Sequence, residues 1–75
     1  MTNNTINIFR KNLKRYRKAL GLTQEKLSEL AGISTDYLSE IERGKTSPSF
    51  KRMDMIANVL GVEVYKLFMP DNECK

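Results

Sequence analysis

The stretch from Thr23 to Gly44, TQEKLSELAGISTDYLSEIERG, constrains the fold more than any other part of the chain. Its apolar residues stand three to four positions apart on both sides of Gly32, which predicts two short amphipathic helices. Glycine accepts the left-handed conformation in which helices often end, so Gly32 is expected to end the first helix. Thr23 and Ser34 stand where the two helices would begin, and their hydroxyls can accept amide hydrogen bonds there. The stretch therefore predicts helix, tight turn and helix.

The spacing also predicts which residues of the two helices face the core. The inward residues are expected to be Leu27, Leu30 and Ala31 in the first helix and Leu38 and Ile41 in the second. If Leu38 and Ile41 face inward, four polar residues of the second helix must face outward. These are Thr35, Asp36, Ser39 and Glu40.

The pattern T-Q-x-x-L-x-x-x-A-G-I-S-x-x-x-L-S-x-I-E-x-G resembles the helix-turn-helix of the lambda-repressor-like, or Xre-type, DNA-binding domains. The resemblance extends from about Phe9 to Phe68. It implies a compact all-α domain of five helices, in which the second and third helices form the helix-turn-helix. It also implies that Arg17 pairs with Glu42 and so ties the first helix to the end of the third. The four outward residues of the third helix align with the base-reading positions of the family.

The rest of the chain fits a single domain, residues 1–75, with a core over about 6–69 and flexible ends at 1–5 and 70–75. One apolar face at three- and four-residue steps predicts a first helix, which Gly21 would end. Its members are Ile6, Phe9, Leu13, Tyr16 and Leu20.

A fourth helix is expected after the turn residues 45–49, with Ser49 as the better cap and Ser47 followed by Pro48 as the alternative. Its buried side would hold Phe50, Met53, Ile56, Ala57 and Leu60. A fifth, of a turn or two, should run from about Val64 to Met69. Because Glu63 stands where the family usually has a good capping residue, that helix is expected to begin raggedly.

Composition limits the classes of function. The chain has a formal charge of +4 and a sequence pI near 9.4, which suits a polyanionic partner, although solubility alone would explain so small a charge. The single cysteine, Cys74, can form no internal disulfide, which indicates a reducing cytoplasm. No apolar run approaches the roughly 18 residues of a membrane span, and the first residues are too polar for a signal peptide. A soluble, cytoplasmic protein is expected.

Catalytic and cofactor motifs are missing from the sequence. It contains no histidine, no glycine-rich phosphate loop and no metal-ligand spacing. Asp36 and Glu40 lie one turn apart, but so small a core implies no cleft in which two carboxylates could do acid–base chemistry. We expect no enzyme, no metal, no cofactor and no small-molecule ligand.

The chemistry of the outward residues suits double-stranded DNA. Thr35 can donate or accept a hydrogen bond, and its methyl group can touch that of thymine. Asp36 and Glu40 can accept from the amino group of cytosine. Ser39 completes the expected base contacts. The competing interpretation is that all four residues are simply exposed to solvent.

Phosphate contacts are expected around the reading helix, because carboxylates facing DNA must be offset by cations and amides. Lys51 and Arg52 are informative, since cations at a helix N-terminus oppose its dipole unless an anion bridges them. The amides in the first turn of the second helix could bind another phosphate. The expected phosphate contacts are Thr23, Gln24, Tyr37, Arg43, Lys45, Thr46, Lys51 and Arg52.

The last expected helix is crowded with apolar residues, only about half of which could face a small core. The others would need a twofold partner, with Val64, Leu67 and Phe68 as the best candidates. The favoured function is a transcriptional regulator that binds a palindromic operator as a homodimer, either a phage-type repressor or a restriction-modification controller protein. The alternative is a protein-interaction module, such as an antitoxin or anti-repressor, with weak or no DNA binding.

Overall fold

The protein was analysed as a computed structural model that describes residues 4–70. Its four α-helices are α1 (Asn4–Ala19), α2 (Gln24–Ala31), α3 (Thr35–Glu42) and α4 (Phe50–Leu60). The segment η1 (Val64–Phe68) is a 3-10 helix of five residues. The described part is all-helical as predicted, but it holds four α-helices rather than five, because the segment before Pro70 is too short and too poorly capped to continue as an α-helix.

The ends of the elements follow the predicted caps. Thr23, Ser34 and Ser49 each accept the amide of the residue three positions on, from Lys26, Tyr37 and Arg52 respectively. Ser49 therefore caps α4, as the sequence favoured over Ser47. Glu63 makes no side-chain cap, which confirms the ragged start expected for η1.

The first helix begins earlier than predicted. α1 starts at Asn4, so residues 4 and 5 are helical instead of belonging to a flexible end. The remaining predicted ends, residues 1–3 and 71–75 with Cys74, lie outside the described residues.

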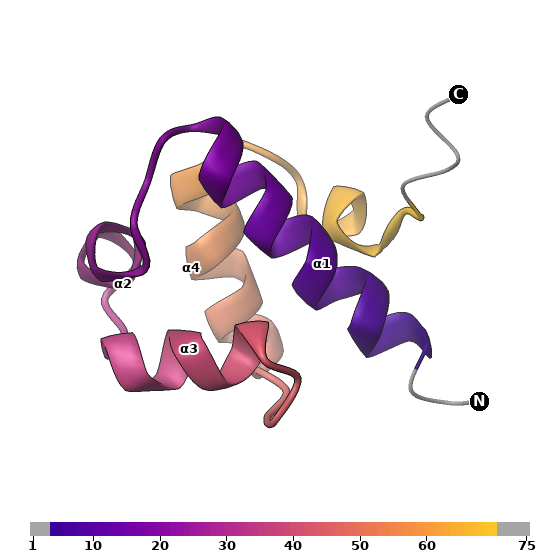
Figure 1. Ribbon diagram of the computed structural model, residues 1–75. Coiled ribbons are helices and arrows are strands. Elements are labelled where there is room, and N and C mark those ends of the chain that lie inside the picture. The colour runs from indigo at the N-terminus through magenta and orange to yellow at the C-terminus, as the bar shows by residue number, and fades with distance from the viewer. Residues whose placement is uncertain (1–3, 71–75) are drawn as a thin grey trace.

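All five elements contribute to one core. α1 packs against α3 and η1, α2 packs against α3 and α4, and η1 also contacts α4. Figure 1 shows α1 crossing the molecule, with α3 at the bottom of the view and η1 beside α1. The largest of the fully buried side chains are Phe9, Leu13, Leu27, Leu38, Ile41, Ile56 and Leu67.

Three apolar residues expected in the core are exposed. Leu20 is 53% exposed because α1 ends at Ala19 and the turn that follows leaves the helical period. Leu30 is 52% exposed, since it lies roughly 100° around α2 from the centre of the stripe that is buried there. Phe50 is 79% exposed because it begins α4, and the buried stripe starts one turn later at Met53.

The 3-10 helix η1 is held against α1 by packing and by hydrogen bonds. Leu67 is fully buried, and the ring of Phe68 packs at 5.1 Å from that of Phe9. The amide of Asn12, itself buried, donates to the carbonyls of Leu67 at 2.9 Å and Met69 at 2.7 Å. Leu67 belongs to the core, so its assignment to a dimer interface was wrong. Val64 and Phe68 are only partly buried.

Candidate nucleic-acid interface

The helix-turn-helix is formed by α2, a glycine turn and α3. Gly32 ends α2 in the left-handed conformation at φ 76°, which a residue with a Cβ atom rarely adopts. The next amide, of Ile33, donates to the Ser28 carbonyl at 3.0 Å and closes the turn. Ser34 then caps α3. Adjacent residues thus set the angle at which α3 leaves α2.

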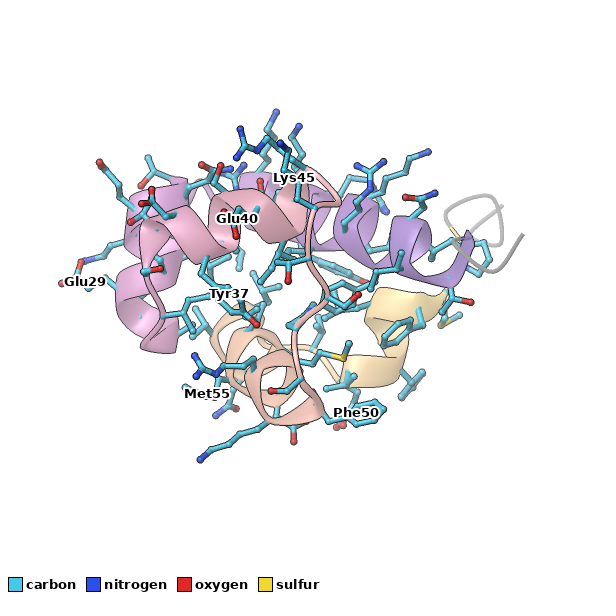
Figure 2. All side chains as sticks on the ribbon, turned by 90° about the horizontal axis from the view of Figure 1, so that it is seen from below. Glu29, Tyr37, Glu40, Lys45, Phe50 and Met55 are labelled. Carbon is cyan, nitrogen blue, oxygen red and sulfur yellow. The ribbon has the colours of Figure 1, made fainter. Side chains whose placement is uncertain are left out.

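The four expected base-reading residues all lie on α3, outside the core. The inner side of α3 is formed by Leu38, Ile41 and Glu42. Asp36 and Glu40 are exposed, whereas Thr35 and Ser39 are half-buried. Figure 2 looks from the side on which α3 lies, and shows Glu40 and Lys45 together at one edge and Phe50 at the opposite edge.

The structure brings Arg17 and Glu42 together, as the family resemblance implied. Nε of Arg17 donates to Oε2 of Glu42 at 2.7 Å, and Nη2 donates to Oε1 at 3.1 Å. The two side chains are 9% and 2% exposed. A third guanidinium nitrogen, Nη1, donates to the Leu22 carbonyl at 2.8 Å. One buried arginine therefore joins α1, the connection before α2 and the end of α3.

Gln24 is linked to this ion pair. Its Nε2 donates to Oε1 of Glu42 at 2.9 Å. A side-chain amide has two N–H groups, so Gln24 can give one to Glu42 and the other to a phosphate. Arg10 reaches the same region, where Nη1 donates to the Glu42 carbonyl at 3.3 Å. The Gln24 side chain is thus held in place by the end of α3.

The other expected phosphate contacts surround α3. The Thr23 side chain is exposed at the start of α2, and Arg43 and Lys45 are exposed just after α3. Thr46 is half-buried in the loop that follows. The exposed pair Lys51 and Arg52 lies in the first turn of α4, which contains no acidic residue.

Arg52 also lies against a side chain of α3. Cζ of Arg52 lies 5.6 Å from the centre of the Tyr37 ring, a distance at which a cation and an aromatic face attract each other. The start of α4 thereby contacts the first turn of α3.

Two buried polar residues were not singled out from the sequence. Asn12 fastens η1, and Ser28, which is 3% exposed, lies 2.9 Å from the Thr35 hydroxyl. The signal was present in both cases, because Asn12 is three residues after Phe9 and Ser28 is three before Ala31 on the inner faces of their helices. A polar residue at a core-facing position needs a hydrogen-bond partner.

Comparison with known proteins places the chain in a family. The model of the helix-turn-helix family HTH_3 matches residues 13–67, most of the chain. The chain belongs to this helix-turn-helix family. The similarity to lambda-repressor-like domains predicted from the sequence is thereby confirmed.

Relatives in the family are HTH-type transcriptional regulators. The regulator y4dJ of Sinorhizobium fredii is 39% identical over 62 residues, which cover 83% of this chain and 80% of y4dJ. SinR of Bacillus subtilis is also 39% identical over 62 residues, but these cover 81% of this chain and 56% of SinR. The chain therefore spans little more than half the length of SinR.

The fold is shared with solved structures, of which two illustrate the similarity. The restriction-modification controller protein C.AhdI of Aeromonas hydrophila has a TM-score of 0.80 at 33% identity, covering 84% of this chain and 96% of that one. SinR in complex with DNA has a TM-score of 0.77 at 37% identity, covering 81% of this chain and 98% of that one.

Over residues 4–70, no helix combines the length and apolar character that crossing a membrane requires. Within that same stretch, no three histidine, cysteine, aspartate or glutamate side chains gather where a metal ion could be held.

Proposed function

We propose that the protein is a sequence-specific DNA-binding transcriptional regulator that inserts α3 into the major groove. The observation that carries the proposal is α3 itself, whose inner side is locked into the core while Asp36 and Glu40 are exposed. The fold is that of SinR, which has been solved with DNA. Thr35, Asp36, Ser39 and Glu40 are the proposed base contacts, and the proposed class of regulator is a phage-type repressor or a restriction-modification controller protein.

Phosphate binding supplies much of the affinity in this proposal. Lys51 and Arg52 place two positive charges at the N-terminus of α4, where the helix dipole is also positive, and no acid in that turn offsets them. A phosphate would relieve this repulsion. Gln24 and the first amides of α2 would form a second phosphate site. Thr23, Tyr37, Arg43, Lys45 and Thr46 complete the proposed contacts.

The proposed active form is a homodimer on a palindromic operator. Tyr65 and Met69 are 60% and 42% exposed, and Val64 and Phe68 are partly buried beside them in η1. A twofold contact through this surface would cover these side chains. It would also place the two copies of α3 about 34 Å apart, one turn of DNA.

Selection of bound sequences from a random DNA pool tests the function directly. A selected site with twofold symmetry is expected, and failure to enrich any sequence would contradict the proposal and favour a protein partner. Affinity should then fall steeply with salt, and Lys45→Ala should lower the slope of log affinity against log salt by about 0.9. Lys18→Ala is the matched control, because Lys18 is an exposed cation in the last turn of α1 and is not among the proposed phosphate contacts.

Sedimentation of two surface variants tests the dimer. Tyr65→Ser should shift the protein from dimer to monomer at micromolar concentration. Leu20→Ser removes a similarly exposed apolar residue, 53% against 60%, from the turn after α1 and should leave the dimer intact. A parent protein that stays monomeric would contradict the dimer but not the DNA-binding proposal.

A further inference from the structure

The hydroxyl groups of Ser28 on α2 and Thr35 on α3 form a hydrogen bond between the two helices. Their oxygens are 2.9 Å apart. The Ser28 hydroxyl also donates to the carbonyl of Glu25 at 2.8 Å. Ser28 is 3% exposed, so its hydroxyl is almost completely shielded from water. Both contacts must therefore be made with the protons that the two side chains carry.

Counting these protons fixes the direction of the bond between the two hydroxyls. A carbonyl oxygen carries no proton, so Ser28 must use its only proton on Glu25. The contact between the hydroxyls then requires the Thr35 proton, with Ser28 as acceptor. Thr35 has no second proton. Towards the outside, its hydroxyl can offer only lone pairs.

The two carboxylates on the reading face have the same limitation. Asp36 and Glu40 are exposed, and an ionised carboxylate only accepts hydrogen bonds. In the major groove, adenine and cytosine present amino groups that donate, whereas guanine and thymine present oxygen and nitrogen atoms that accept. An acceptor placed against guanine or thymine therefore finds no proton to share.

We infer that Ser28 is a specificity-determining residue that never touches DNA: by holding the Thr35 proton, it makes Thr35 select an adenine or cytosine on the strand it contacts. The inference rests on the proposed function and names the base chemistry that α3 reads. Ser28 acts through Thr35 and is a positioning residue.

Sequence selection with four proteins tests this inference: the parent, Ser28→Ala, Thr35→Val and the double variant. Thr35→Val keeps the methyl group but removes the hydroxyl, so the position at which it loses preference identifies the base that Thr35 reads. Affinities are then measured on four duplexes that differ only at that position. The parent should prefer adenine or cytosine over guanine or thymine by roughly tenfold, the range of one hydrogen bond gained or left unmade.

Ser28→Ala should reduce this preference to about twofold or less, because the freed Thr35 proton can then be donated to a guanine or thymine oxygen. In the Thr35→Val background the same substitution should change nothing, since Ser28 acts through the missing hydroxyl. A merely structural role of Ser28 would weaken binding to all four duplexes equally. An undiminished preference in Ser28→Ala, or a parent that prefers guanine or thymine there, overturns the inference. A parent that enriches no sequence would instead overturn the proposed function.

Discussion

The short helical segments α3 and η1 are held in opposite ways. Ser34 caps α3 through a side-chain bond to the amide of Tyr37, three residues on. Glu63 gives η1 no such bond. Instead, η1 is held by Asn12, whose amide donates to carbonyls 55 and 57 residues further along the chain. The difference shows that neighbours in sequence define α3, whereas the fold as a whole defines η1.

Contacts between residues distant in sequence nevertheless support the end of α3. The Arg17–Glu42 pair joins α1 to the last turn of α3, and its two residues are 25 positions apart in sequence. This buried charge pair supports both the end of α3 and the side chain of Gln24. The start of α3 is thus set by neighbouring residues, whereas its end is supported by residues distant in sequence.

Breaking that distant support should have the largest effect. Arg17→Ala leaves the Glu42 carboxylate buried with no cationic partner, which should lower the free energy of unfolding by about 3–5 kcal/mol. Denaturant unfolding monitored by circular dichroism measures the loss. Lys18→Ala, the neighbouring exposed cation, should change stability by less than about 0.5 kcal/mol. An unfolding curve for Arg17→Ala that overlays the parent would show that α3 needs no tie to α1.

Removing the support of η1 should have an intermediate effect. Asn12→Ala leaves the carbonyls of Leu67 and Met69 without their donor, which should cost about 1–3 kcal/mol. Amide hydrogen exchange should accelerate in η1 more than in α3. The exposed Asn58→Ala on α4 is the control. Equal acceleration in both segments would contradict the idea that they are held separately.

The local cap of α3 should matter less. Ser34→Ala removes the bond to the Tyr37 amide and should lower the free energy of unfolding by about 1 kcal/mol. Ser47→Ala, an exposed loop serine with no capping role, should be close to neutral. If the two variants melt at the same temperature, the start of α3 is set by packing rather than by its cap.

The smallest expected effect is a gain. Glu63→Ser would give η1 the capping hydroxyl that it lacks and should raise the free energy of unfolding by roughly 0.5 kcal/mol. The change should also slow amide exchange in η1 towards that of α3. Unchanged stability would mean that a five-residue 3-10 helix gains nothing from a local cap.

Much of the fold was predictable because its signals lie close together in sequence. The caps Thr23, Ser34 and Ser49 and the turn at Gly32 act on residues within one helical turn. The prediction from apolar spacing was wrong at Leu30 and Phe50, which are exposed. The helical period shows which residues share a face of a helix, but it does not show how much of that face the neighbouring elements cover. The prediction was also wrong at Leu67, which lies in the core and not at a surface available to a partner.

The features of the candidate site also separate into those set by the sequence and those set by the tertiary structure. The sequence by itself determined that α3 carries Thr35, Asp36 and Glu40 on one polar side, because helical phase depends only on position along the chain. It also showed that Thr35 has a hydroxyl, which can donate one proton and can accept hydrogen bonds with its lone pairs. Only the tertiary structure decided where that proton goes, because the acceptor, Ser28, belongs to another helix and has already committed its own proton to Glu25.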